Sequence, residues 1–308
     1  MVCSIIYKNN ARGGPMSKDH IIPQFILRGF SINPSSAKTN QKVMVYYKDT
    51  RTIETKRIVD VYSIQDFNSQ TTERALAEKY ESNVARLFQR IALLATSKND
   101  SFVLSNAEYR LLHRFFVVMW RRNSIHMERA LDMGNQLETM LKSLFGSHYQ
   151  KMLKPEYKDY SFEKLFKEKY DDLRQSFYEK VVSETSDDDP TVKKTLEMYS
   201  PSIIHNTSSI HFLLHNTYST VIYAFPKNSP FISNDANPIR MLFPISNTLC
   251  FDLILSEEKT DCSKNEYQIP IEECSKDQII KQYYIDSYKI PNARSYIVDK
   301  TNKSFVLE

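Results

Sequence analysis

The chain has 308 residues, of which 41% are hydrophobic and 25% charged, and these ordinary globular proportions exclude a wholly disordered protein. Its formal net charge of +4 at pH 7 is too small for a generally basic surface, so any nucleic-acid contact has to be local. No run of apolar residues is long enough to cross a bilayer, so we expect no membrane-spanning segment.

Glycine is scarce, and its positions exclude the common nucleotide-binding loops. A phosphate-cradling loop needs glycine because the backbone amides must approach the ligand closely. None of the five glycines lies in G-x-G-x-x-G or G-x-x-x-x-G-K, so we expect no nucleotide cofactor. The four cysteines are widely spaced and never form C-x-x-C, which favours a reduced, cytoplasmic protein without a zinc knuckle.

Residues 1–15 are interpreted as a leader outside the fold. This stretch lacks the charged, apolar and small-residue regions of a signal peptide. Arg12-Gly13-Gly14 just before Met16 is compatible with a translated ribosome-binding stretch, which leads to the hypothesis that Met16 is the native start. The remaining residues, 16–308, are predicted to form one domain.

The first elements of this domain are a short helix and a hairpin. The helix is expected after Pro23, at residues 26–30. The β-like segments 42–47 and 52–61 are separated by a short polar stretch, which predicts a hairpin.

Four helices are then predicted from helical periodicity and from capping signals. They begin near Thr72, at the capping box Ser105–Glu108, at Ser161 and at Asp189-Pro190. The first runs to about residue 95, and the second runs toward Gly146 with or without a break. In the third, the apolar stripe includes residues 170, 173, 177 and 181.

Beyond Pro201 the segments become short and rich in β-branched and aromatic residues, which favours strands. These candidate strands are residues 219–225, 231–233, 239–243 and 248–255. A helix at about 275–289 and a strand at 295–299 end the chain. The fold class is therefore predicted as α+β: a helix-rich single domain with a small antiparallel sheet formed by the N-terminal hairpin and the C-terminal strands.

Two charged residues occupy positions that apolar residues usually take. Arg122 falls on the inward stripe of its helix, where a guanidinium needs a carboxylate or an anionic ligand as its partner. The alternative is a structural ion pair or a side chain that reaches solvent. Glu73 lies in the first turn of the helix predicted from Thr72, on the same side as its inward stripe. Its alternative role there is to complement the helix dipole.

Other candidates are His20, Gln24 four residues later, and Asp235. Each has a plain alternative: His20 as an ordinary core or surface histidine, and Asp235 as a turn residue. His211 and His215 have the i, i+4 spacing that suits zinc on a helix, but the Glu of H-E-x-x-H is missing, so a structural role is preferred.

These features together resemble the bacterial domain of unknown function 4238 family over residues 18–305. The resemblance rests on the opening motif H-x-x-P-Q-x-x-L-x-x-F at 20–30, Glu73 with Glu81, F-F-V-V-M-W-R-R at 115–122, and F-I-S-N-D-A-N-P at 231–238. Two departures are Asn123-Ser124, where the family has Thr-Pro, and one extra residue in the late motif. The resemblance implies a shared polar site but no particular chemistry.

The leading functional hypothesis is hydrolysis of a phosphodiester, with RNA a candidate substrate. His20 would act as general base, Arg122 would bind the phosphate, and carboxylates such as Glu73 and Asp235 would orient the base or hold a divalent cation. Gln24 would complete the site. The alternative is a non-enzymatic module for a ligand or protein, in which these polar residues form a structural network. Substrate and oligomeric state are left open.

Overall fold

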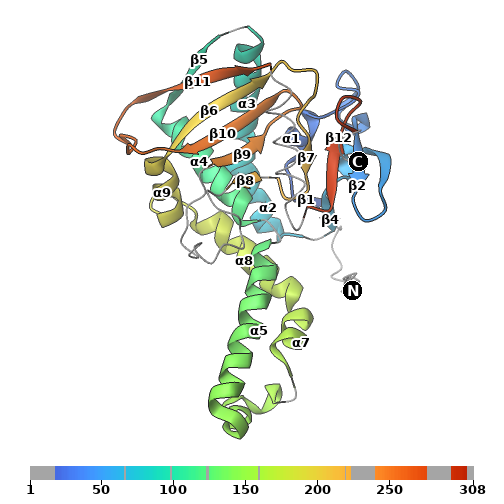
Figure 1. The fold of residues 1–308 in the computed structure, drawn as a ribbon, viewed down its shortest axis with the longest axis vertical. Coiled ribbons are helices and arrows are strands. Elements are labelled where there is room, and N and C mark those ends of the chain that lie inside the picture. Colours follow the sequence, from blue (N-terminus) through green and yellow to red (C-terminus); the bar gives the residue numbers. More distant parts are fainter. Residues whose placement is uncertain are drawn as a thin grey trace.

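The computed structural model of the protein describes residues 18–65, 67–97, 99–122, 125–158, 160–218, 220–222, 240–275 and 293–303. Figure 1 shows a body of sheets and covering helices, from which a helical arm projects. Within the described ranges, no helix combines the length and apolar character that a bilayer span requires. The leader, the strand at 231–233, the helix at about 275–289 and Asp235 lie outside these ranges.

The chain enters the body through a short ladder and a helix. Strand β1 (Lys18–His20) pairs antiparallel with β4 (Ser63–Gln65). Helix α1 (Gln24–Arg28) begins directly after Pro23, so the predicted helix is confirmed with a start two residues earlier. The restricted φ of proline suits this position, since a helix start leaves the proline nitrogen without a lost hydrogen bond.

A four-stranded antiparallel sheet joins the two ends of the chain. Its strands are β3 (Thr52–Arg57), β2 (Lys42–Tyr47), β12 (Ser295–Val298) and β7 (Leu214–His215), in that order. This sheet confirms the predicted hairpin and the predicted partnership between the hairpin and the C-terminal end. The α+β fold class is confirmed as well.

Most of the late strands, however, form a second sheet rather than joining the hairpin. Its order is β5 (Ser101–Ser105), β11 (Glu266–Cys274), β6 (Tyr199–Asn206), β10 (Leu249–Leu255), β9 (Arg240–Pro244) and β8 (Thr220–Ile222). The pair β11–β6 is parallel, and the other pairs are antiparallel. Strand β10 is nearly all buried at its start, so it needs strands on both edges, and β6 and β9 occupy them.

The predicted helix at 72–95 is a continuous helical rod with an irregular turn inside it. Helix α2 (Gln70–Leu76) is capped by Ser69, whose side chain accepts a hydrogen bond from the Thr72 backbone N–H. A single π-helical turn, Ala77–Glu81, follows, and α3 (Ser82–Thr96) continues the rod. A π turn inserts an extra residue and so rotates the side chains on either side relative to each other.

Helix α4 (Asn106–Arg121) begins at the predicted capping box of Ser105 and Glu108. It covers the six-stranded sheet, because the Phe116 ring lies 4.1 Å from the ring of Phe243 in β9. Helix α4 ends at Arg121 and α5 (Ile125–Phe145) is a separate helix, so the predicted long helix is divided. Helix α9 (Pro190–Met198) also begins as predicted, with the Asp189 side chain accepting backbone hydrogen bonds.

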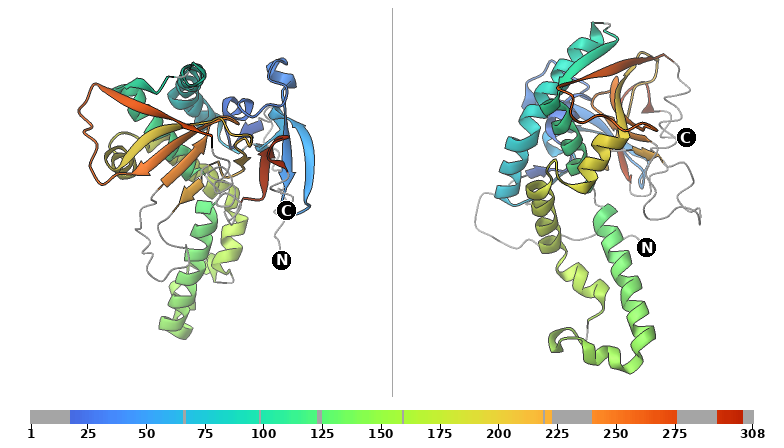
Figure 2. Two further views of the ribbon diagram at one scale, coloured as in Figure 1. Left: turned by 45° about the horizontal axis from the view of Figure 1, so that its top comes forward. Right: turned by 90° about the vertical axis from the view of Figure 1, so that its left-hand side faces the viewer.

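The arm consists of α5 and the segments that return beside it (Figure 1, Figure 2). These are α6 (Tyr149–Met152), α7 (Phe162–Glu168) and α8 (Tyr170–Glu184). Ser161 caps α7 as predicted, but a break at Lys169 divides the expected single helix into α7 and α8. The break also shifts the buried face of α8 to residues 174, 178, 181 and 182. Of the predicted stripe, Val181 is buried and Phe177 packs half-buried against the core, but Leu173 is exposed, so the stripe is wrong at 173.

Candidate functional site

Arg122 ends helix α4 and is almost fully buried, with 1% of its surface exposed. The predicted inward position of this side chain is therefore confirmed. Its Nη1 lies 4.0 Å from the Met119 sulfur, whereas Nε and Nη2 have no hydrogen-bond partner among the described residues. Burying a guanidinium whose N–H groups have no acceptor costs folding free energy, so a bound acceptor would stabilise this side chain.

A small, partly open cavity of about 90 Å³ is lined by this side chain and by Arg174 of α8. Arg174 is 3% exposed, and its guanidinium carbon lies 4.7 Å from the centre of the Phe67 ring. Its Nη1 is 3.0 Å from the exposed carboxylate of Asp171, and its Nε has no described partner. Two buried cations therefore share one cavity, which favours an anionic occupant.

The wall of the cavity contains a backbone outlier. Tyr218, just after β7, has a φ of 65°, a left-handed conformation that bulky residues rarely adopt. Its hydroxyl is buried and has no partner within the described ranges. The other lining residues are Ile21, Ile64, Phe67, Met119, Tyr170, Tyr178, Asn216 and Thr217.

Arg174 and Tyr218 were missed by the sequence reasoning. For Arg174 a signal existed: Tyr170, Arg174 and Tyr178 follow each other at four-residue spacing, as Arg122 follows Val118. The break at Lys169 obscured this row, because a helical stripe continued from α7 without a break predicts a different buried face for α8. For Tyr218 the sequence offers no comparable signal.

Glu73, in the first turn of α2, belongs to a chain of polar contacts from β1. The Asn68 side chain donates a hydrogen bond to Glu73 Oε1, and the Asn68 backbone N–H donates to Asp19 Oδ2 at 2.9 Å. Burial raises the pKa of Glu73, and the nearby Asp19 carboxylate adds to this effect. The hydrogen bond from Asn68 and the charge of Arg122 act in the opposite direction on this pKa.

Glu81 lies in the π turn, and the charge of Arg122 affects its pKa as well. Burial raises the pKa of Glu81 to about 7; the Arg122 charge opposes this effect, and Glu73 contributes to it. A carboxyl group with such a pKa exchanges its proton near neutral pH, as a general acid or base must. A π turn at this position is also notable, because such turns occur frequently at functional sites.

His20 and Gln24 contact each other, although His20 lies in β1 and Gln24 begins helix α1. The Gln24 amide lies 3.4 Å from His20 Nδ1, and Gln24 Oε1 accepts a hydrogen bond from Arg28. His20 Nε2 lies 3.3 Å from the Ile58 carbonyl oxygen. The two sequence neighbours of His20 connect it to the rest of the site. Asp19 accepts the hydrogen bond from Asn68, which in turn contacts Glu73, and Ile21 lines the cavity.

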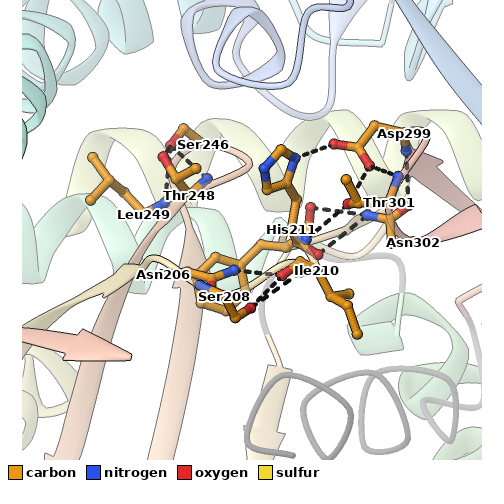
Figure 3. Close-up of polar contacts among 11 residues, drawn as sticks. Asn206, Ser208, Ile210, His211, Ser246, Thr248, Leu249, Asp299, Thr301 and Asn302 are labelled. Carbon is orange, nitrogen blue, oxygen red and sulfur yellow. Dashed lines mark hydrogen bonds and ion pairs between the residues drawn. The ribbon is translucent and has the colours of Figure 1, made fainter. Parts of the chain in front are cut away.

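His211 and His215 do not share a helix, so the zinc interpretation of their spacing is wrong and the structural one is supported. His211 precedes β7 and its Nδ1 lies 2.6 Å from Asp299 Oδ2, within a network that ties this loop to the segment after β12 (Figure 3). His215 is in β7, where burial lowers its pKa to about 3. No group of three or more His, Cys, Asp or Glu side chains in the described ranges is placed to hold a metal ion.

Comparison with known proteins adds a family but no activity. The family described as "Protein of unknown function (DUF4238)" matches residues 18–307, which include every residue of the site above. No curated protein and no solved structure matches the chain.

Proposed function

The chain belongs to the DUF4238 family of proteins of unknown function, and we propose that it binds a phosphate group in the Arg122–Arg174 cavity and hydrolyses a phosphodiester there. The observation that carries this proposal is the pair of buried guanidinium groups with unused N–H donors at one cavity. Guanidinium groups match the oxygens of phosphate in geometry and charge. A bound phosphate would supply acceptors for Nε and Nη2 of Arg122 and for Nε of Arg174, which have no partner among the described residues.

The size of the cavity limits what it can hold. Its volume of about 90 Å³ corresponds to roughly three water molecules, or to one phosphate-sized group. The rest of a larger substrate, RNA among the candidates, would therefore lie outside it. The tyrosine and phenylalanine rings in the wall provide apolar surface next to the charged group.

Hydrolysis needs a base for water and an acid for the leaving oxygen. Glu81, with a pKa of about 7, is suited to transfer a proton, and His20 beside Gln24 is the candidate base. Water attacks phosphorus as the base takes its proton, and the departing alkoxide oxygen is protonated while Arg122 neutralises the developing charge. Glu73 and Asp235 are the candidates for orienting the base or for holding a divalent cation.

A second candidate function is favoured by the hydrogen bonds from Asp19 through Asn68 to Glu73. In this alternative the polar residues are a structural network of a binding module, and Arg122 only neutralises the carboxylates of Glu73 and Glu81. Removing Arg122 would then leave buried carboxylates uncompensated and would destabilise the fold.

The two functions predict opposite results for Arg122→Met. If the cavity serves a ligand, inorganic phosphate raises the unfolding free energy of the wild type by about 2.7 kcal/mol at a concentration 100-fold above its Kd. Arg122→Met loses this gain, because methionine offers phosphate neither a charge nor an N–H donor. The measurement is thermal unfolding against phosphate concentration. Arg90→Met, which removes an exposed arginine from α3, is the matched control.

Catalysis is tested separately on an activated phosphodiester and on single-stranded RNA. We expect Glu81→Gln to retain phosphate binding and to lose about 100-fold or more of the hydrolysis rate. Phosphate binding without hydrolysis by the wild type would support a binding module instead. An Arg122→Met variant that unfolds, with no effect of phosphate on the wild type, would support the structural network.

A further inference from the structure

Helix α5 carries an exposed stripe of large apolar side chains. The stripe is formed by Met133, Leu137, Met140 and Leu144, which are 70%, 52%, 51% and 68% exposed. Single apolar residues on a surface are common, but a continuous row of this kind marks an interaction site.

The stripe is a different face of α5 from the one that packs within the chain. The internal face contacts α7: the Phe162 ring lies against Gly134, and Glu138 accepts a hydrogen bond from the Phe162 backbone N–H. Successive residues turn by about 100° around a helix, which places Gly134, Glu138 and Leu141 together and the stripe on another side. Helix α5 therefore has one covered face and one uncovered apolar face.

The spacing of the stripe is that of a coiled-coil seam. Intervals of four, three and four residues place its members at alternating a and d positions of a heptad, over a length of about 16 Å. This order of intervals reads the same from both ends. Two antiparallel copies of the stripe can therefore meet with all four residues in register.

We propose that two copies of this chain pair antiparallel through α5, with Met133 of one copy against Leu144 of the other and Leu137 against Met140. The arm projects from the body, so a second copy can reach this face without meeting the sheets (Figure 1, Figure 2). The pairing is isologous: the same patch serves both subunits.

Charge and area favour a second copy as the occupant. The residues beside the stripe include Gln136, Leu141 and Ser143, which carry no charge, so identical faces meet without like-charge repulsion. The exposed apolar area is on the order of 500 Å² per copy, and pairing buries roughly 1,000 Å², near the lower limit of specific interfaces. We therefore expect a reversible dimer whose population depends on concentration.

The test is sedimentation equilibrium of the full chain and of two matched variants. Leu137→Glu introduces a carboxylate into the stripe, and Thr139→Glu introduces the same group on an exposed, polar side of the same helix. We expect the wild type and Thr139→Glu to dimerise, and Leu137→Glu to weaken the dimer at least about 100-fold, because two carboxylates would be buried in each dimer.

A mixing experiment tests the antiparallel register. In that register position 137 faces position 140 of the partner, so Leu137→Glu mixed with Met140→Lys forms a pair that neither variant forms alone. A wild-type chain that stays monomeric at all concentrations, or a dimer that Leu137→Glu leaves intact, would overturn the proposal. Loss of association in both variants without recovery on mixing would overturn the register. Circular dichroism of each variant separates lost pairing from lost folding.

Discussion

At the scale of single residues, Arg122 and Glu81 show how burial changes what a side chain can do. The charge of Arg122 acts to lower the pKa of both Glu73 and Glu81, yet burial still raises the pKa of Glu81 to about 7. The balance matters because a fully compensated carboxylate would not exchange protons at neutral pH. Glu81 is therefore the residue whose titration is most informative.

Glu81→Gln should change how stability depends on pH. Unfolded Glu81 loses its proton near pH 4.5, and the folded group loses it near pH 7, so the folded state holds an extra proton between these values. The free energy of unfolding of the wild type therefore falls through this window as pH rises. Relative to the wild type, the variant should gain up to about 3 kcal/mol above pH 7 and nothing below pH 4.5.

Urea unfolding at a series of pH values measures this difference. Glu78→Gln, which removes an exposed carboxylate from the same turn, is the control. Parallel stability curves for the wild type and Glu81→Gln would contradict the raised pKa.

At the scale of elements, the arm depends on a close approach of two helices. A Cβ at Gly134 would lie 1.9 Å from Phe162 Cε1, far inside contact distance, so the Phe162 ring can occupy this position only because residue 134 is glycine. Glycine within a helix costs about 1 kcal/mol relative to alanine, and the packing of Phe162 offsets that cost. In α5 the lower helix propensity of Gly134 is therefore offset by the packing of Phe162 against it.

A double-mutant cycle should show this trade as a change of sign. Gly134→Ala alone displaces the Phe162 ring from its place and should destabilise the protein by about 1–2 kcal/mol, in spite of the better propensity. In a Phe162→Ala background the same substitution should stabilise by about 1 kcal/mol, because the ring is gone. Chemical denaturation of the four proteins measures the coupling, and additive effects would show that the contact is not tight.

At the scale of the whole molecule, the buried histidines set a limit on stability in acid. His113 in α4 and His215 in β7 are fully buried, and burial lowers the pKa of each to about 3. Neither ring nitrogen of His113 has a hydrogen-bond partner within the described residues. Both histidines are thus held neutral by the packing of the helices and sheets around them.

Unfolding between pH 3 and 6.5 should therefore take up a proton at each histidine, and stability should fall as pH falls through this window. His113→Phe, which keeps an aromatic ring beside Tyr109, removes one of these protons. Its stability curve should be shallower than that of the wild type by about 1.4 kcal/mol per pH unit near pH 5. Glu81 acts in the opposite direction, so the two proteins are compared at each pH; equal slopes would refute the prediction.

Local signals in the sequence were enough to place many helix starts. The capping hydrogen bonds connect residues at most three positions apart, so a short stretch of sequence is enough to predict them. The examples are Ser105 with Glu108, Ser161, and Asp189 before a proline. The hairpin and the inward direction of Arg122 follow in the same way from turn residues and helical period. These features were determined by the sequence alone.

The arrangement of distant segments was decided only by tertiary packing. The division of the late strands between two sheets, the phase of α8 after its break, and the meeting of Arg174 with Arg122 all depend on contacts between residues far apart in the chain. Such contacts have no local signature, because an apolar segment indicates that it is buried but not which surface covers it. The cavity is lined by residues from distant parts of the chain, so no single sequence motif indicates it.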